Sequence, residues 1–521
     1  MNNEQKKSFL ILTLGCKLNQ LESESITDTF IQADYSQFPA PDSQLPPSVI
    51  VINTCTVTSK ADQKARRVIR KAMRDYPSAC VVVTGCYAQL NKDDILNLET
   101  DGRQRLHVVS KDKVLDYFKN INTSSPRASA PLRDNKSVFQ SVFQFNPQRF
   151  SAHTRSFLKI QDGCDRHCTY CRIRLARGKS VSLEAEEVLS RLLVLEQNHA
   201  EAVLTGVNIS QYMDRRFHAE TQRHGGKEEK NFSTNQDELL PSVCTRTEEN
   251  KVFGLAELLD YLLSGTEKIA IRLSSLAPES VDEKLAKILS HPRIRPHFHL
   301  SIQSCSEKIL AKMGRNYNAQ IIEKAVSLLR GAKSAGTSAA GDPFIACDII
   351  AGFPGETEFE FEETFSLCQK LDFAWIHVFP YSKRQGTSAF SFSDNVHESG
   401  VTKRVQRLTE LAEQGKARYV ERWLGREVEV LIEREKNLTT NGTCGSFTNR
   451  HEHIFFCHGV SENYLKTLVL HNGEKAHKTG DVVICRLIEK GDGKDFDVVG
   501  TPQNIYLMSQ ANCLTQKRCK R

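Results

Sequence analysis

The stretch SFLKIQDGCDRHCTYCR (156–172) decides the fold of the largest part of the chain. It predicts an apolar strand followed by a turn with three cysteines, Cys164, Cys168 and Cys171, in a C-x3-C-x2-C spacing. Three thiolates this close in sequence can converge on one metal centre by wrapping around it, as in iron–sulfur sites. A zinc site with His167 is the alternative, although zinc motifs usually come as two pairs and no second pair follows.

Similar strand-like segments recur every few tens of residues after position 150. Helical patterns fill the intervals, which predicts a parallel, six-stranded partial (β/α)6 barrel over residues 150–422. Residues 214–251 interrupt this rhythm with 15 charged residues in 38, and they predict an inserted surface loop. The six segments are SFLKIQDG (156–163), AVLTGV (202–207), IAIRLSS (269–275), FHLSIQS (298–304), FIACDIIAGF (344–353) and AWIHVFPYS (374–382).

Three earlier apolar runs predict strands of a parallel-sheet α/β domain over residues 1–121, joined to the barrel by a linker at 122–149. The runs are FLILTLG (9–15), SVIVINT (48–54) and CVVVTG (80–85).

A cysteine directly follows each of these runs: Cys16, Cys55 and Cys86. The carboxyl ends of parallel strands meet at one sheet edge, where α/β folds bind ligands, so the three thiols can form a second ligand set. Taken singly, each is more typical of an ordinary buried residue. Cys80, which opens a strand at the opposite edge, is an example of that alternative.

Residues 59–77 predict a helix with one apolar and one basic side. The basic side is either ordinary solvated surface or part of a patch that contacts phosphates. The same two alternatives, solvated surface or phosphate contact, apply to three residues just after the last barrel strand: Tyr381, Lys383 and Arg384. The basic residues of the helix are Lys60, Lys64, Arg67, Lys71 and Arg74.

The pattern changes after Gly425 to short β segments separated by Gly and Asn turns. This predicts a small antiparallel β-barrel over residues 423–500, followed by a basic tail at 501–521 to which no structure is assigned. The expected strands are VEVLIE (428–433), HIFFCHG (453–459), KTLVLHN (466–472), DVVICRLIEK (481–490) and DFDVVG (495–500).

Composition limits the class of protein. A chain of 521 residues has room for three or four domains, and its 39% hydrophobic and 26% charged residues are typical of a globular protein. The net charge of +7 permits a polyanionic partner. No apolar run is long enough to span a membrane, and the N-terminal apolar run is short for a secretory signal. We therefore expect a cytoplasmic protein whose 16 cysteines are reduced.

The cysteine loop resembles that of the radical S-adenosylmethionine enzymes. They carry C-x3-C-x2-C after the first strand of a partial barrel, with an aromatic residue before the last cysteine, here Tyr170. The resemblance implies that Cys164, Cys168 and Cys171 hold a catalytic [4Fe–4S] cluster. Its fourth iron would chelate S-adenosylmethionine, which an electron from the cluster cleaves to a 5′-deoxyadenosyl radical.

Nearly the whole chain resembles the methylthiotransferases of that class. They have an N-terminal α/β domain with an auxiliary three-cysteine cluster and a C-terminal TRAM-like RNA-binding β-barrel. The resemblance implies a second [4Fe–4S] cluster on Cys16, Cys55 and Cys86. It rests on NTC, TGCYAQ, DGCDRHCTYC, ARG (176–178), LTGVN (204–208), DIIAGFPGET (348–357) and FPYSKRQGT (379–387).

Within the family, GCKLNQ (15–20) and FPYSKRQGTSA (379–389) look like the branch that modifies tRNA next to the anticodon. The implied reaction adds CH3–S to carbon 2 of N6-threonylcarbamoyladenosine in the anticodon stem-loop. A flavodoxin or ferredoxin would donate electrons, and the sulfur donor stays open. The alternatives are methylthiolation of isopentenyladenosine in tRNA or of a ribosomal protein. Two alternatives outside the methylthiotransferases are a non-catalytic iron–sulfur RNA-binding protein and a zinc protein.

Contacts to S-adenosylmethionine are expected at the carboxyl ends of the barrel strands. A glycine after a strand, as in AGFPGET (351–357), lets backbone approach a ligand, or it simply makes a strand–helix turn. HLSIQSC (299–305) has Cys305 where the family usually has glycine, in a loop expected to face the cofactor, so no glycine-specific backbone angle is expected there. The expected contact residues are Tyr170, Gly206, Ser275, Gln303, Gly352 and Gly355.

Overall fold

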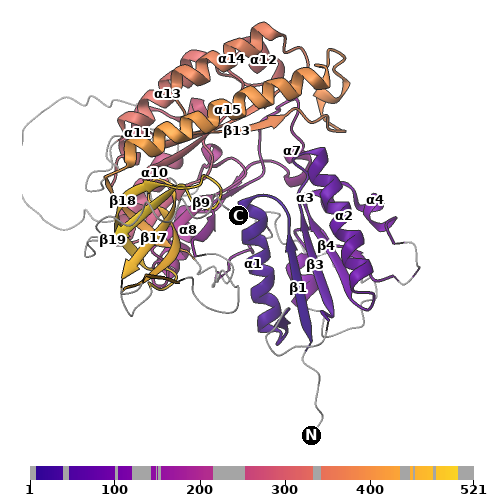
Figure 1. Ribbon diagram of the computed structural model, residues 1–521. Coiled ribbons are helices and arrows are strands. Elements are labelled where there is room, and N and C mark those ends of the chain that lie inside the picture. Colours follow the sequence, from indigo (N-terminus) through magenta and orange to yellow (C-terminus); the bar gives the residue numbers. More distant parts are fainter. Residues whose placement is uncertain are drawn as a thin grey trace, which may run out of the picture.

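The computed structural model shows three units in chain order: an N-terminal sheet domain, a central partial barrel and a small C-terminal β-barrel (Figure 1). Nearly all of the expected insertion at 214–251, most of the expected linker and residues 503–521 lie outside the described residues. The structure describes residues 7–38, 46–99, 102, 104–119, 142–147, 150, 154–214, 253–332, 342–433, 446–449, 452–472 and 477–502.

The N-terminal domain is built on a parallel five-stranded sheet in the order β2-β1-β3-β4-β5. The three predicted strands form its centre, and the prediction of a parallel sheet is confirmed. The two outer strands have only two and three residues, too few to show an apolar pattern. The strands are β1 (Ser8–Thr13), β2 (Ser36–Gln37), β3 (Val49–Thr54), β4 (Cys80–Gly85) and β5 (Leu106–Val108).

Five helices among the described residues accompany this sheet. The predicted amphipathic helix is present as α2, and its first turn is capped by Thr58, whose side chain accepts a hydrogen bond from the Ala61 N–H. Its apolar stripe, including Ala65, Ile69 and Ala72, is buried against the sheet, while the basic side faces outward. The helices are α1 (Lys17–Gln32), α2 (Ser59–Asp75), α3 (Cys86–Leu90), α4 (Lys92–Leu96) and α5 (Val114–Lys119).

The central domain is a partial barrel of six parallel strands, as predicted. Its two halves have the strand orders β6-β9-β10 and β11-β12-β13, and two parallel bridges, Ile271–Ile294 and Leu276–Leu300, join them. A short antiparallel pair, β7 (Gln161–Asp162) with β8 (Val181–Ser182), flanks the cysteine loop. The barrel strands are β6 (Ser156–Lys159), β9 (Glu201–Thr205), β10 (Ala270–Leu273), β11 (His297–Gln303), β12 (Phe344–Ala351) and β13 (Trp375–Pro380).

Helices cover the outside of the barrel strands and bury one large apolar core against them (Figure 1). Phe143, in the region expected to be linker, packs into this core, and Phe145 packs into the core of the N-terminal domain. The helices are α7 (Ile173–Arg177), α8 (Ala185–Glu196), α10 (Leu255–Gly265), α11 (Glu283–Leu289), α12 (Glu307–Met313), α13 (Ala319–Gly331), α14 (Glu358–Leu371) and α15 (Glu398–Trp423), with 3-10 turns η1 (Ile209–Gln211), η2 (Pro278–Ser280) and η3 (Ser388–Ser391).

The C-terminal unit is a closed β-barrel with the strand order β14-β18-β19-β17-β16-β15, and the pairing of β14 with β16 closes it. The predicted barrel is confirmed, but the pair β17–β19 is parallel, because β19 enters between β18 and β17 after its hairpin with β18. The strands are β14 (Glu427–Ile432), β15 (Ser446–Asn449), β16 (Glu452–Ser461), β17 (Lys466–Asn472), β18 (Val482–Lys490) and β19 (Val498–Pro502).

This small barrel closes the amino end of the central barrel. The ring of Tyr464, in the turn between β16 and β17, stacks on His297 at the start of β11, with 4.0 Å between ring centroids. The Arg272 guanidinium donates to the Ser461 carbonyl oxygen at 3.4 Å and pairs with Glu201 at 2.7 Å. The contact is a packed interface, because Tyr464 is half-buried and its neighbours His297, Arg272, Glu201 and Ser461 are buried. None of the described helices is both long and apolar enough to cross a membrane.

Candidate active site between two cysteine triads

The first triad lies in the loop that follows β6 at the carboxyl edge of the barrel. The loop is fixed by its own backbone: the Cys164 N–H donates to the Gly178 carbonyl at 3.1 Å, and the Cys171 N–H donates to the Cys168 carbonyl at 3.1 Å. Burial raises the pKa of the Cys171 thiol to about 11, and the neighbouring Cys168 and Cys164 thiols add to the rise. All three cysteines are free and partly exposed, so the loop brings three available thiols together.

A glycine is required where the chain enters this loop. Gly163 has φ +69°, and a Cβ there would overlap the carbonyl oxygen of Lys179 on the returning strand. On the other side, the Thr169 N–H donates to the Met313 carbonyl at 3.0 Å, which ties the middle of the loop to the end of α12. The loop is therefore held at both of its sides.

We expect Gly163→Ala to lower both the melting temperature and the iron content, because the loop could not close over Lys179. Gly493→Ala is the matched control: it has the same φ of +69°, and no atom lies within 4 Å of its added Cβ. The control carries only the cost of a left-handed alanine, about 1–2 kcal/mol. Thermal unfolding and iron analysis of the two variants test this. Equal melting temperatures would contradict it.

The second triad lies at the carboxyl edge of the N-terminal sheet. Cys16 precedes α1 and is exposed, Cys55 follows β3 and is buried, and Cys86 opens α3 and is buried. Burial raises the pKa of the Cys55 thiol to about 11, and Cys16 and Cys86 add to the rise. At Gly15, with φ +109°, an added Cβ would lie 2.9 Å from the Cys55 sulfur. The sheet edge thus brings the three thiols together, whereas Cys80 lies at the far end of β4.

The donor chemistry of both triads fits iron–sulfur clusters. Each triad offers three free thiols, and thiolates are the ligands that such clusters take. Among the described residues, no three His, Cys, Asp or Glu side chains converge closely enough for a single metal ion. A cubane differs from such a site because each thiolate binds its own iron. Cys164, Cys168 and Cys171 would hold one cluster, and Cys16, Cys55 and Cys86 the other.

Arg177 joins the two triads. It lies on α7, directly after the first triad, and its Nε donates to the Cys86 sulfur at 3.3 Å. Burial would raise the pKa of the Cys86 thiol, but Arg177 and Lys111 outweigh burial and lower it. The sequence places Arg177 in the ARG motif without giving it a role. Its position immediately after the cysteine loop is the signal that could have identified it.

The Arg177 guanidinium is itself held in a buried charge cluster across the two domains. Its Nη1 lies 3.1 Å from carboxylate oxygens of both Asp162 and Glu22. Lys111 also pairs with Glu22, at 2.8 Å, and Lys159 pairs with Asp162. Burial would raise the pKa values of both carboxyls, but the surrounding cations outweigh burial and lower them. Both carboxylates are therefore charged and fix the guanidinium beside Cys86.

Arg384 fixes the second domain contact. Its Nη2 pairs with Asp62 at 2.7 Å and donates to the Thr56 carbonyl, next to Cys55, at 3.0 Å. The side chain is only 5% exposed, so neither sequence alternative, phosphate binding or solvation, describes it. Lys383 is exposed, and Tyr381 is half-buried against Phe353. The loop after β13 thus anchors the N-terminal domain at the barrel mouth.

The structure places all six expected cofactor contacts at the carboxyl ends of the barrel strands or in the cysteine loop. The Tyr170 hydroxyl accepts a hydrogen bond from Arg315 at 2.8 Å. Gln303 ends β11 with φ +71°, which is uncommon for a residue with a side chain and concentrates at functional sites. Gly206 follows β9, where a Cβ would lie 2.9 Å from the Gln161 carbonyl oxygen. Ser275 follows β10 and is half-buried.

Gly352 and Gly355 need glycine for reasons internal to the chain. Both have positive φ, which strains any residue with a side chain, and at Gly352 a Cβ would also overlap Val401. The Gly352 N–H donates to the Glu356 carboxylate at 2.6 Å. These contacts account for the two glycines as a strand–helix turn, and a cofactor contact from either stays a prediction.

Cys305 does not face the mouth. It is buried, its thiol contacts that of Cys368, and its N–H donates to the Thr364 hydroxyl at 3.1 Å. As expected, it has no positive φ; the unusual backbone angle of this segment belongs to Gln303 instead.

A polar group inside the barrel was missed by the sequence analysis. His299 Nε2 lies 2.9 Å from the Asp348 carboxylate, and His299 stacks on His377 with 5.1 Å between ring centroids. The Trp375 indole donates to His377 Nδ1 at 3.3 Å. These residues come from β11, β12 and β13, alternating with residues that pack outward into the apolar core. That alternation is the signal that could have revealed a polar barrel lining.

Comparison with known proteins agrees with this geometry. A six-stranded partial barrel with a three-cysteine loop at its carboxyl edge defines the radical S-adenosylmethionine class, and the model of the Radical SAM superfamily matches residues 158–368. The model of the uncharacterized protein family UPF0004 matches residues 8–103. Among solved structures, the radical S-adenosylmethionine methyltransferase TsrM from Kitasatospora setae is 14% identical with a TM-score of 0.41, covering 72% of this chain and 75% of that one.

Similar proteins identify the family within the radical S-adenosylmethionine class. The threonylcarbamoyladenosine tRNA methylthiotransferase MtaB of Treponema pallidum is 34% identical, over 93% of this chain and 99% of that protein. The protein of the same name in Bacillus subtilis is 31% identical, over 92% and 93%. A tRNA-2-methylthio-N(6)-dimethylallyladenosine synthase of Geobacillus thermodenitrificans is 27% identical, over 86% and 78%. The chain therefore belongs to the radical S-adenosylmethionine methylthiotransferases, in the threonylcarbamoyladenosine branch, and is an enzyme.

Proposed function

We propose that this enzyme adds a methylthio group to carbon 2 of N6-threonylcarbamoyladenosine next to the anticodon of tRNA. The observation that carries the proposal is Arg177, which follows the first cysteine triad and donates to Cys86 of the second at 3.3 Å. Because Arg177 ends the short helix α7 that follows the first triad, this contact brings Cys86 of the second triad next to that helix, which supports one site shared by the two triads. The relatives named for this reaction support the choice of substrate.

Two [4Fe–4S] clusters and S-adenosylmethionine, with electrons from a flavodoxin or ferredoxin, would supply the radical and methyl-transfer chemistry at this site. The chain's own residues hold and orient the groups. The two triads provide the thiolates, Arg177 places a positive charge beside Cys86, and Arg384 keeps the Cys55 loop against the barrel mouth. The Tyr464 contact seals the opposite end of the barrel. We place the reaction in the cytoplasm, where tRNA is modified.

The barrel lining favours the polar substrate over isopentenyladenosine. His299, Asp348 and His377 present hydrogen-bonding groups, and an isopentenyl group could satisfy none of them. A threonylcarbamoyl group carries amide, hydroxyl and carboxylate groups that can. His299 and Asp348 are half-buried and pair with each other, and the exposed His377 accepts from the Trp375 indole. The lining therefore favours a threonylcarbamoyl group through the additional hydrogen bonds that such a group can form and an isopentenyl group cannot.

The proposal is tested with anaerobically reconstituted protein and two synthetic anticodon stem-loops, one with threonylcarbamoyladenosine and one with isopentenyladenosine. We expect a mass increase of one methylthio group on the first RNA only, and loss of the same modification in cells that lack the protein. Product on the isopentenyl RNA alone would move the enzyme to the other branch. Absence of S-adenosylmethionine cleavage by the reduced protein would leave the non-catalytic RNA-binding alternative.

A further inference from the structure

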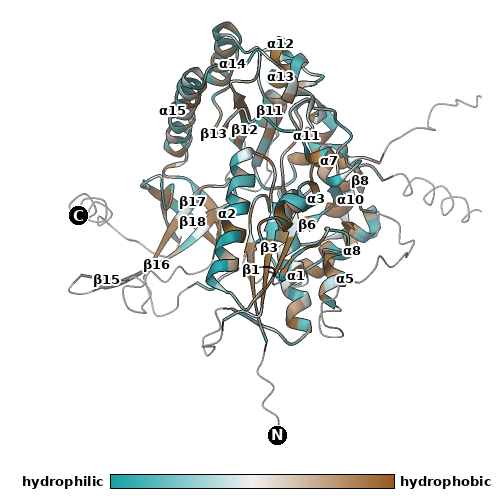
Figure 2. Cartoon of the chain, turned by 90° about the vertical axis from the view of Figure 1, so that its right-hand side faces the viewer, coloured by the Kyte–Doolittle hydropathy of each residue, from teal (hydrophilic) through white to brown (hydrophobic). Residues whose placement is uncertain are grey.

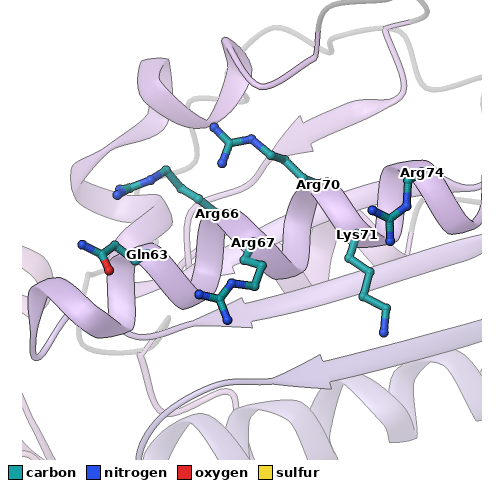
Figure 3. A pocket seen from close by; sticks show the side chains of 6 residues that line it. All are labelled: Gln63, Arg66, Arg67, Arg70, Lys71 and Arg74. Carbon is teal, nitrogen blue, oxygen red and sulfur yellow. The ribbon is translucent and has the colours of Figure 1, made fainter.

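Helix α2 presents a row of cations along its outer face. Figure 3 shows Arg66, Arg67, Arg70, Lys71 and Arg74 projecting from successive turns. With Gln63 they line a shallow hollow of about 640 Å³. Lys60 and Lys64 extend the same face towards the start of the helix and are exposed. In Figure 2 this helix is mostly hydrophilic on the side that faces the viewer.

Within the part of the chain that the structure describes, most of these cations have no acidic partner. Among the described residues, a carboxylate lies within salt-bridge distance only of Arg74, with Asp75 at 3.0 Å. Arg66 donates to the Tyr87 hydroxyl instead, at 2.9 Å. On the outer helices of the central domain the pattern is different, since exposed cations there pair with acids: Lys324 with Glu283, Lys370 with Glu323, and Arg407 with Glu362.

The spacing on α2 makes this arrangement unfavourable without a ligand. Arg67 and Lys71, and Arg70 and Arg74, are four residues apart, so like charges lie side by side on the helix surface. Such pairs destabilise a helix. A bound polyanion would convert this repulsion into attraction.

The row begins at the mouth of the barrel. The Ser59 N–H, in the first turn of α2, donates to the Ser382 hydroxyl at 2.9 Å, in the loop after β13. The buried Arg384–Asp62 pair fixes the same turn to that loop. From there the 17 residues of α2 run for about 25 Å. The cations therefore form a track that starts where a substrate nucleoside would enter and extends away from it.

We propose that the outer face of α2 binds the phosphate backbone of the RNA whose modified nucleoside enters the barrel mouth. The inference rests on the proposed function. Four of the cations that line the hollow are arginines, whose planar forks match phosphate oxygens. The α2 track gives affinity and register along the backbone, while the barrel lining selects the base.

The test is the triple variant R67Q/R70Q/K71Q in the full-length enzyme. Glutamine keeps helix propensity and removes the like-charge pairs, so the melting temperature is expected to stay equal or rise. tRNA binding should weaken, and the slope of log affinity against log salt should become shallower by about 2 to 3, as for three lost phosphate contacts. The preference between the two modified stem-loops should not change.

The matched control is K324Q/K370Q/R407Q, which removes the same charge from paired cations on α13, α14 and α15 and should leave the salt slope unchanged. Wild-type binding with an unchanged slope in the α2 variant would overturn the inference while the proposed function stands. So would slower reduction by flavodoxin with full RNA affinity, since an acidic protein would then be the partner. Failure of the wild-type enzyme to bind tRNA at all would overturn the proposed function and the inference together.

Discussion

Alanine at Cys164, Cys168 and Cys171 together is expected to remove half of the iron from the reconstituted enzyme and all formation of 5′-deoxyadenosine. Two four-iron clusters give about eight irons in the wild type, one cluster on each triad. Replacing Cys16, Cys55 and Cys86 should also halve the iron, yet leave S-adenosylmethionine cleavage measurable, because the first triad remains. Iron analysis and nucleoside chromatography under anaerobic conditions provide both readouts.

Cys80 supplies a control for these variants. Cys80 is the first residue of β4, and Cys86 directly follows the other end of this strand. Burial raises the pKa of the Cys80 thiol to about 11. Cys80→Ala should keep all of the iron. If the first triple variant retained full iron, the cluster assignment would be wrong. If the second lost S-adenosylmethionine cleavage as well, the two sites would not be separable.

Arg177→Ala is expected to cost about 3–5 kcal/mol of unfolding free energy, the usual result when one partner of a buried ion pair is removed. The substitution would leave Asp162 and Glu22 with less compensation in a buried site and would take the donor away from Cys86. The N-terminal domain should then dock less firmly, with loss of iron from the second triad. Arg177→Lys should keep the charge but not the branched contacts, and should give an intermediate loss.

Arg174→Ala on the same short helix is the matched control. Arg174 is partly exposed, and its guanidinium contacts His167 and the Asp165 carbonyl without a buried carboxylate. Its removal should change the unfolding free energy by less than about 1 kcal/mol. Chemical denaturation of the apoproteins measures both effects without interference from cluster loss. Similar stabilities for the two variants would show that the Arg177 charge cluster does not stabilise the fold.

The features that could be predicted from the sequence are those formed by residues close together in the chain. The barrel strands show as apolar runs, and each triad cysteine follows a strand or lies in one short loop. The Arg177–Cys86 contact spans 91 residues and the Arg384–Asp62 pair spans 322, so no local pattern reports them. Arg384 reads as a surface cation because its acidic partner belongs to another domain. The short edge strands β2 and β5 were missed because they are too brief to alternate.

Gly352 and Cys305 illustrate a second limit. The sequence shows where a glycine is present or replaced, but it does not show which neighbouring atom would overlap a Cβ at that position. At Gly352 that atom belongs to Val401, on a helix almost fifty residues further along the chain. From the sequence, Cys305 is only a residue that stands where the family usually has glycine. The structure shows that its thiol contacts the thiol of Cys368.

The Tyr464 turn has a consequence for how this protein can be dissected and for how it could have evolved. Because that turn covers Arg272, Glu201 and His297, and Trp423 is fully buried beside it, the C-terminal barrel forms the floor of the catalytic domain. A deletion intended to remove an accessory module would uncover paired charges and core side chains. We therefore expect an exchange of this barrel between relatives to succeed only together with the residues beneath it.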